Sequence, residues 1–293
     1  MRTVLKLLLL FILAQVLGLI VMNAFVAGGL ARQISVGEFS LEDIFFLIIG
    51  LAFTVLLVLA LLKFYTGNLL YQIMEFVVVA AASFVVFYGI GYYVGFGEIE
   101  AVLLALALSA LKQLVPHMKN TAAVVSSAGV AAMFAMFLSF WEAVVFLVVM
   151  SAYDYVAVFI TRHMITLASE FGRREMSFSI TSQDKIKERV LVQKKGGGVQ
   201  EKTVERVEHL ELGTGDIALP LAFNLVVFRG VALVNTGAAI STFIIIGVFS
   251  ALALGLVLAY VKKRRLFLPA LPPILLGTLI GYMLAYISGI IVV

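Results

Sequence analysis

Two aspartates lie in apolar stretches of this chain, where their type and position suggest chemistry. Asp154 is inside the apolar run 141–160, and Asp216 directly precedes the apolar run 217–228. A carboxylate in hydrocarbon costs roughly 2.5 kcal/mol or more, so an acid at such a depth is a functional candidate. Two carboxylates that share one proton can activate water and hydrolyse a peptide bond. The two aspartates are therefore the first candidate site.

The elements that must position these acids are membrane helices. Of the 293 residues, 63% are hydrophobic and 13% are charged, which excludes a soluble globular protein. Apolar runs of about 20 residues are long enough to cross a bilayer as helices. We therefore expect an all-α polytopic membrane protein, with residues 1–293 forming a single nine-helix domain. The predicted spans are approximately 7–28, 44–64, 71–95, 99–115, 121–140, 143–162, 215–234, 238–260 and 270–291.

Some boundaries are less clear than others. The run 122–160 is almost unbroken and about 40 residues long, which is two spans, with Trp141-Glu142 as the expected interfacial turn. The first apolar stretch continues to about Leu30, so we interpret it as a retained span instead of a signal peptide. Glu75, one turn into the third span, is expected to snorkel or to cap.

The distribution of basic residues supports nine spans. With this count, 19 of the 21 Lys and Arg residues fall on one face, and only Arg32 and Arg229 fall on the other. The positive-inside rule then places the N-terminus in the cytoplasm and the C-terminus outside.

The one substantial soluble segment, about 163–211, separates spans one to six (7–162) from spans seven to nine (215–291). It is highly charged and contains Gly196-Gly197-Gly198. We expect a flexible cytoplasmic loop with a short hairpin, in which 189–193 turns through the glycines. It could be a solvated linker, or it could guide substrate or be cut itself.

Helix geometry places the two acids at similar depths. Asp154 precedes the cytoplasmic end of span six by about 12 Å, and Asp216 is roughly 6–8 Å into span seven, at 1.5 Å per residue. Adjacent antiparallel helices could bring both carboxylates to one water-filled cavity near the cytoplasmic face.

The neighbours of the acids allow more than one interpretation. Gly213 and Gly215 flank Thr214 and permit close approach of another backbone. Alternatively, Asp216 is only an N-terminal acid stabilised by the helix dipole. Tyr153 could donate a hydrogen bond to Asp154 or could simply pack.

A third feature is the sequence Pro269-Ala270-Leu271-Pro272-Pro273, which follows the basic residues 262–265. Prolines are common where a helix begins. Three prolines so close together also imply non-helical backbone with free carbonyls, which membrane proteins tolerate where it is buried or lines a cavity. This segment is predicted at the same depth as both aspartates.

Other chemistries are excluded by what the sequence lacks. There is no cysteine, and His117, His163 and His209 are scattered without metal-ligand spacing. No nucleotide-binding or serine-hydrolase motif is present. The net charge of +4 resides in membrane-flanking loops, so it does not indicate nucleic-acid binding. We expect no metal and no cofactor.

In combination, the motifs resemble those of the presenilin and signal peptide peptidase family of intramembrane aspartyl proteases. That family has Tyr-Asp, Gly-x-Gly-Asp and Pro-Ala-Leu in this order, on spans six, seven and nine of nine. The resemblance implies that Asp154 and Asp216 are the catalytic pair. It also implies that Pro269, Ala270 and Leu271 shape the site and contact substrate.

The chain departs from the family pattern in three places. Thr214 stands where leucine is common, Leu268 stands where glutamine is frequent, and two further prolines follow Leu271. A long N-terminal tail and a long loop between spans six and seven are missing, which is similar to a compact microbial homologue. The expected orientation is similar to that of presenilin and opposite to that of signal peptide peptidase.

The resemblance implies hydrolysis of peptide bonds within single-span membrane-protein substrates, in the bilayer of a microbial cell. We expect the chain to need no accessory subunit. The alternative is an ion- or proton-coupled transporter or channel, because membrane acids also serve as proton relays and broken helices line transport sites. Against this alternative, the sequence has no paired half-length repeats, and Asn224 and Asn235 are isolated.

Overall fold

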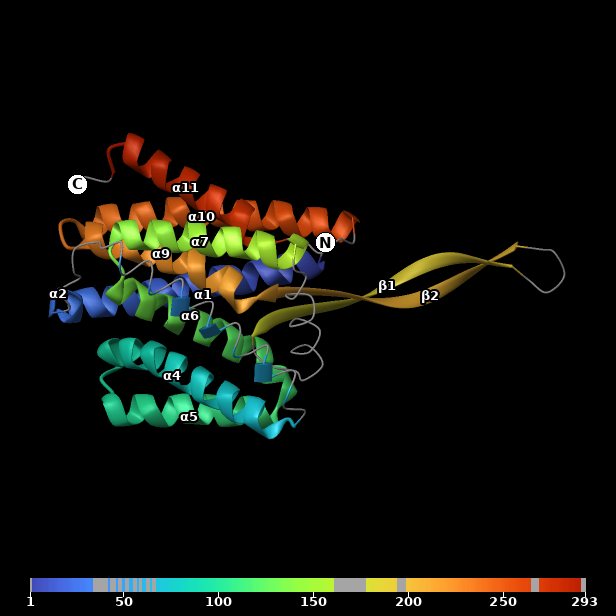
Figure 1. Ribbon diagram of the computed structural model, residues 1–293, viewed down its shortest axis with the longest axis horizontal. Coiled ribbons are helices and arrows are strands. Elements are labelled where there is room, and N and C mark those ends of the chain that lie inside the picture. The colour runs from blue at the N-terminus through green and yellow to red at the C-terminus, as the bar shows by residue number, and fades with distance from the viewer. Residues whose placement is uncertain are drawn as a thin grey trace.

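The computed structural model describes residues 2–33, 67–160, 178–193, 199–264 and 269–290, with scattered positions between 42 and 64. The described chain is a bundle of long helices from which one two-stranded hairpin projects (Figure 1). The helices are α1 (Arg2–Ala27), α2 (Leu30–Gln33), α4 (Leu69–Val94), α5 (Glu98–Leu114), η1 (Pro116–Met118), α6 (Lys119–Phe137), α7 (Phe140–Tyr155), the π-helix η2 (Val156–Ile160), α9 (Thr214–Ala232), α10 (Thr236–Arg264) and α11 (Leu271–Ile287).

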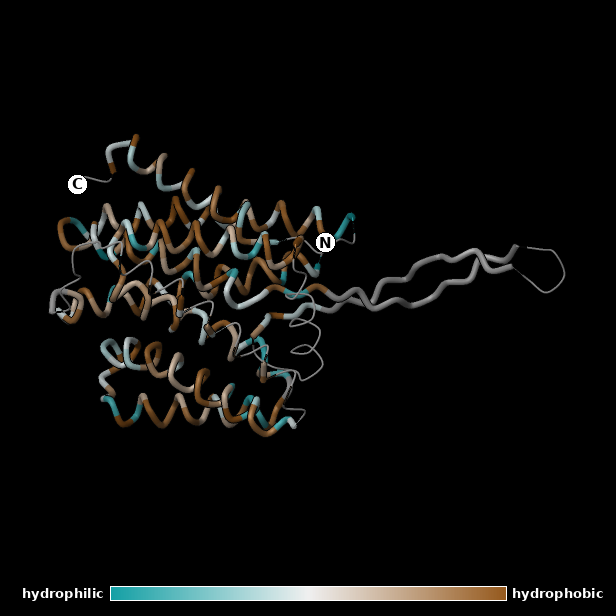
Figure 2. The backbone as a smooth tube through the Cα atoms, viewed as in Figure 1, coloured by the Kyte–Doolittle hydropathy of each residue, from teal (hydrophilic) through white to brown (hydrophobic). Residues whose placement is uncertain are grey.

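Hydrophobic residues dominate these helices along their length (Figure 2). Among the described residues, six helices are long and apolar enough to cross a membrane: α1, α4, α6, α7 with η2, α9 and α10. Helix α11 is apolar but shorter. With α5, these helices occupy eight of the nine predicted spans, within a few residues at each end. The remaining predicted span, 44–64, lies largely outside the described residues.

The expected turn at Trp141-Glu142 is wrong by three residues. Helix α6 ends at Phe137 and α7 begins at Phe140. Ser139 is the N-cap of α7: the Glu142 backbone N–H donates to its hydroxyl at 3.4 Å, and the Ser139 N–H donates to the Glu142 carboxylate at 2.6 Å. This capping box satisfies two backbone donors of the first turn, so Glu142 belongs inside the helix and not in the turn.

Helix α9 is the centre of the bundle. Every residue from Ile217 to Arg229 is buried, and α1, α6, α7, α10 and α11 all pack against it. In contrast, α1, α4 and α10 have long exposed apolar faces of the kind that lipid covers. The structure therefore surrounds the Asp216 helix with protein on all sides.

Small residues allow the helices around α9 to approach closely. A Cβ added at Gly129 of α6 would lie 1.9 Å from the Ala82 carbonyl oxygen of α4. A Cβ at Gly277 of α11 would lie 2.7 Å from the Phe249 carbonyl oxygen of α10. Any side chain at either position would push two helices apart, which is typical of packing between membrane helices.

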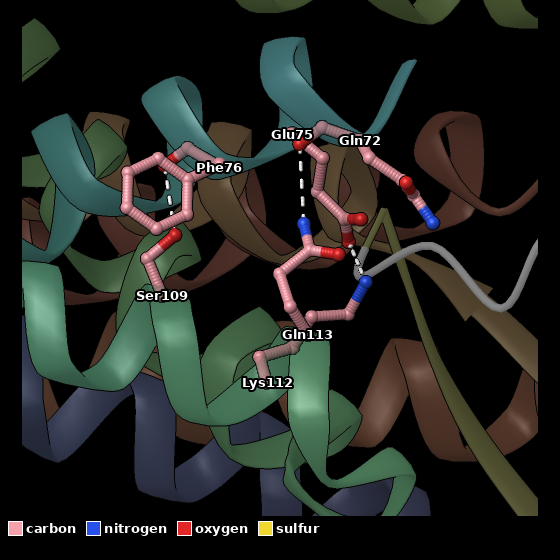
Figure 3. Close-up of polar contacts among 6 residues, drawn as sticks. All are labelled: Gln72, Glu75, Phe76, Ser109, Lys112 and Gln113. Atoms are coloured by element: carbon pink, nitrogen blue, oxygen red, sulfur yellow. Dashed lines mark hydrogen bonds and ion pairs between the residues drawn. The ribbon is translucent and has the colours of Figure 1, made fainter. Parts of the chain in front are cut away.

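Helices α4 and α5 are joined by polar contacts that the sequence interpretation missed (Figure 3). Glu75 is buried and forms an ion pair with buried Lys112. Ser109 donates to the Phe76 carbonyl at 2.8 Å, and Gln113 donates to the Gln72 carbonyl at 3.1 Å. The expectation that Glu75 snorkels or caps is therefore wrong, because its partner comes from the next helix and not from solvent.

Arg229 is likewise inside the protein instead of on the outer loop. Its guanidinium donates to the carbonyls of Ala135 at 2.6 Å, Met136 at 2.7 Å and Leu138 at 2.8 Å. These are orphan carbonyls at the C-terminal end of α6, where a cation is favourable. Arg229 thus fixes α9 to the end of α6.

The segment between η2 and α9 contains a long antiparallel hairpin. Strand β1 (Ser179–Gln193) pairs with β2 (Val199–Gly213) in a register that places Ser179 opposite Gly213. The predicted hairpin of 189–193 is therefore correct in place but much too short, and a flexible loop is wrong for both strands. The base of the hairpin lies at the same end of the bundle as the N-terminus (Figure 1).

Candidate active site

Asp154 lies at the end of α7, one residue before the helix changes its hydrogen-bonding pattern. Its side chain is only 7% exposed. After Tyr155, the last residue of α7, the five residues Val156–Ile160 form a π-helix. A π-helical turn is wider than an α-helical one and is frequent at functional sites. Here it alters the course of the chain directly after the acid.

The N-terminus of α11 supplies a hydrogen bond to Asp154. The backbone N–H of Leu271 donates to Asp154 Oδ2 at 3.2 Å. Leu271 is the first residue of α11, and the next two residues, Pro272 and Pro273, have no N–H. Among the first three residues of α11, Leu271 therefore has the single backbone donor, and this donor is aimed at the acid. Pro269 and Ala270 are buried beside it.

Asp216 is the third residue of α9 and is partly buried. Its carboxylate accepts a hydrogen bond from the backbone N–H of Gly213, the N-cap residue. A Cβ at Gly213 would lie 3.3 Å from Asp216 Oδ2, so glycine leaves room for this contact. Pro220 has no N–H, so the Asp216 carbonyl lacks its usual partner four residues later.

The fold brings the two acids together. Helices α7 and α11 pack against each other and against α9, and the charges of Asp154 and Asp216 interact. The interpretation of Asp216 as a helix-terminal acid is compatible with this, because its carboxylate also accepts the hydrogen bond from the N-cap residue Gly213. The predicted convergence of spans six, seven and nine therefore agrees with the described geometry.

Thr214 connects the hairpin to α9. Its backbone N–H and its hydroxyl both donate to the Phe178 carbonyl, at 3.0 and 3.1 Å. Leucine, common at this position of the motif, could not form the second bond. Thr214 therefore holds the base of β1, two residues from Asp216.

Asn120 makes a contact with β1 that the sequence did not reveal. On the first turn of α6, its side chain donates to the Thr181 carbonyl and accepts from the Thr181 N–H, both at 2.9 Å. The amide thus replaces a neighbouring strand along the outer edge of β1. An asparagine at a helix start usually indicates a cap, so no local signal points to this contact.

Two other predicted residues have less defined surroundings. Gly215 is exposed, and a Cβ there would meet nothing within 4 Å, so space is open beside Asp216. Tyr153 is half-buried next to Asp154, and its role stays a prediction. Over the described residues, no group of three or more His, Asp and Glu side chains is arranged to hold a metal ion.

Two solved structures share this fold. Both are described as structures of a presenilin family intramembrane aspartate protease, in C222 and P2 crystals respectively. The first is 22% identical with a TM-score of 0.66, covering 97% of this chain and 99% of that one. The second is 20% identical with a TM-score of 0.62, covering 97% of each chain. No curated protein matches the chain.

The sequence itself matches a family model. The model is described as signal-peptide peptidase, presenilin aspartyl protease, and it matches residues 8–291. This is nearly the whole chain, and it includes the helices that carry both aspartates. The chain is therefore a multi-pass membrane protein that belongs to the signal-peptide peptidase and presenilin family of intramembrane aspartyl proteases.

Proposed function

We propose that Asp154 and Asp216 are the catalytic pair of this protease. The observation that carries the proposal is the meeting of α7, α9 and the N-terminus of α11, which puts two interacting acids and a backbone donor in one place. Acids so close cannot both carry a charge cheaply, so one proton is shared between them.

The shared proton defines the chemistry. The ionised carboxylate takes a proton from water as general base, and the protonated one polarises the scissile carbonyl as general acid. The pair titrates as a unit, so neither role belongs to one named residue. The open space at Gly215 leaves room beside Asp216 for substrate. This chemistry uses only the chain's own side chains, water and substrate.

Strand β2 offers a surface for an unwound substrate segment. The Thr214 N–H donates to the Phe178 carbonyl, so these two residues form a hydrogen-bonded pair of the antiparallel ladder. Such pairs alternate with non-hydrogen-bonded pairs, so the next pair, Gly213 and Ser179, directs its backbone groups away from the partner strand. The Gly213 carbonyl, three residues before Asp216, therefore points away from β1 and could accept a hydrogen bond from an unwound substrate segment.

The membrane arrangement follows from charge and span number. We propose nine spans in one domain, with a cytoplasmic N-terminus and an external C-terminus, in a microbial cell membrane. The 19 basic residues on one predicted face and the short sequence 163–211 between spans six and seven support this arrangement. The catalytic site would then open toward the cytoplasm, where water reaches it most easily. We propose single-span membrane proteins as substrates, cleaved without accessory subunits.

Cleavage by purified protein in lipid vesicles tests the catalytic pair. The substrate is a single-span membrane protein, and the variants are Asp154→Asn and Asp216→Asn, which keep side-chain size but remove the acid. Each variant should lose activity by about 10²–10⁴-fold, the usual contribution of acid–base catalysis. A peptide isostere with a hydroxyl in place of the scissile carbonyl should inhibit the native protein. Activity that survives either substitution would contradict the paired mechanism.

The transporter alternative has no support from the comparisons, which point to proteases over nearly the whole chain. A transporter would be supported only if the native protein cleaved no substrate and instead moved protons or ions across liposome membranes.

A further inference from the structure

An apolar groove opens on the outside of the bundle, next to the candidate active site. Its volume is about 550 Å³. One wall is formed by Tyr155 and Phe159, whose rings are in contact at 5.0 Å between centroids. These residues begin directly after Asp154 and continue into the π-helix. This wall is therefore a continuation of the chain that carries the acid.

The opposite wall is formed by prolines at the start of α11. Pro269, Pro272 and Pro273 line the groove. They surround Leu271, whose N–H donates to Asp154. Tyr155 of the first wall is next to Asp154 in the chain, and the prolines of the second wall flank Leu271. Both walls are therefore close in sequence to the hydrogen bond between the Leu271 N–H and Asp154.

The third wall is the outer face of α10. Leu256 and Tyr260 line the groove and are 74% and 50% exposed, so the groove is open along this side. Lys263 and Arg264 follow three and four residues after Tyr260, on the same face of the helix. Both are exposed. Lys262, by contrast, turns to α1, where its ammonium donates to the Thr3 hydroxyl at 3.1 Å.

The chemistry of the groove changes along its length. Its walls are apolar, while hydrophilic residues gather at the end of α10 nearest the hairpin (Figure 2). An apolar cleft with two cations one turn beyond it along α10 matches a molecule with a hydrocarbon tail and an anionic head. The groove is in the size range of small-ligand sites, about 300–1,000 Å³.

We propose that this groove binds an anionic phospholipid, with an acyl chain between the two walls and the headgroup phosphate at Lys263 and Arg264. The bound lipid holds α7 and α11 at the spacing that keeps the Leu271 N–H on Asp154, and so supports catalysis from outside the site. This coupling rests on the proposed function, whereas the binding does not. With the proposed topology, the basic end of α10 faces the cytoplasmic leaflet, where anionic lipids attract basic residues.

Fluorescence quenching measures the binding directly. The chain has one tryptophan, Trp141, at the far end of α7. In a Trp141→Phe background, Tyr260→Trp places a single fluorophore in the groove. Vesicles of phosphatidylcholine then receive brominated phosphatidylglycerol or brominated phosphatidylcholine. The anionic lipid should quench at a lower mole fraction, with a preference of roughly fivefold for each basic residue.

Matched charge changes locate the headgroup. Lys263→Gln with Arg264→Gln should abolish the preference. Arg2→Gln with Lys6→Gln removes the same charge from exposed positions of α1, which packs on another face of α10 through Thr3 and Lys262, and should leave the preference intact. Equal preference in both double variants would overturn the proposal. So would quenching that is relieved when a substrate helix is added, because the groove would then belong to substrate.

Cleavage in the same vesicles tests the coupling. Adding phosphatidylglycerol should raise the rate severalfold for the native protein and for the α1 double variant, but not for the α10 double variant. A rate that is independent of lipid charge, despite selective quenching, would overturn the coupling. Quenching needs no proteolysis, so selective quenching without any cleavage would count against the proposed function and not against the lipid site.

Discussion

At the scale of single residues, the candidate site depends on one backbone donor. The first three residues of a helix ordinarily present three N–H groups. In α11, two of these three residues are prolines, which have no N–H. The positive end of the helix is thereby reduced to the Leu271 N–H, which donates to Asp154. The donor belongs to the backbone, so only a change to proline removes it.

Leu271→Pro therefore has a specific expected effect. Proline is tolerated at the first position of a helix, so the fold should persist while Asp154 loses its hydrogen bond. Since a bond to a charged group contributes about 1.5–3 kcal/mol, kcat should fall by about 10- to 100-fold relative to Leu271→Ala. Leu271→Ala keeps the N–H and controls for the lost side chain. Equal kcat values for the two variants would show that the donor is unimportant.

The Thr214 hydroxyl makes a second residue-level contact that can be tested. Thr214→Val keeps the branched shape but removes the bond to the Phe178 carbonyl. A neutral hydrogen bond contributes about 0.5–1.5 kcal/mol, so kcat/KM should decrease by up to about tenfold. Thr214→Ser retains the hydroxyl and should stay near the native value. If serine and valine behave alike, the hydroxyl does not hold the hairpin base.

The sequence predicted some of these residues and not others, for physical reasons. Asp154 and Asp216 are conspicuous because a charge in an apolar run is costly. Asn120 is not, because an asparagine at a helix start has an ordinary local role. Its contact with Thr181 joins residues 61 positions apart, and only the fold creates it. The same applies to Arg229, whose partners are more than 90 positions away.

At the scale of elements, the Glu75–Lys112 pair joins α4 to α5 (Figure 3). Both side chains are less than 10% exposed, so neither charge is solvated when its partner is removed. Glu75→Leu alone should destabilise the protein by about 3–5 kcal/mol. The double change Glu75→Leu with Lys112→Met should restore most of the lost stability, because two apolar side chains then replace a buried ion pair. The measurement is thermal unfolding in detergent, and equal losses for the single and double variants would contradict it.

Elements differ in how well sequence predicts them. The span ends come from local apolar runs, so helices such as α4 and α10 lie close to their predicted positions. The hairpin does not follow this rule. Most of β1 and β2 is polar and charged, so no alternation of apolar residues indicates strands, and their pairing joins positions up to 34 residues apart. The α6–α7 turn was misplaced because Trp141 suggested an interface, whereas the Ser139–Glu142 capping box sets the boundary.

At the scale of the whole molecule, the proposed topology can be tested through the absence of cysteine. One substitution introduces one thiol. Val234→Cys, in the exposed connection between α9 and α10, should react in intact cells with a thiol reagent that cannot cross membranes. Leu114→Cys, exposed at the other end of the bundle, should react only after permeabilisation. The reverse pattern would invert the orientation and place the candidate site on the external face.

The enclosure of α9 has a consequence for how the protein is made. The most enclosed helix is also the least apolar of the six candidate spans, because it contains Asp216, Pro220, Asn224 and Arg229. During biosynthesis, such a segment would leave the translocon for lipid only at considerable cost. Helices α1 and α6 precede it in the chain and can shield it as it emerges, and α10 completes the enclosure afterwards. We therefore expect the helix that carries Asp216 to depend on its neighbours for insertion. Variants that weaken the α1 or α6 contacts should reduce the amount of protein in the membrane before they alter its chemistry.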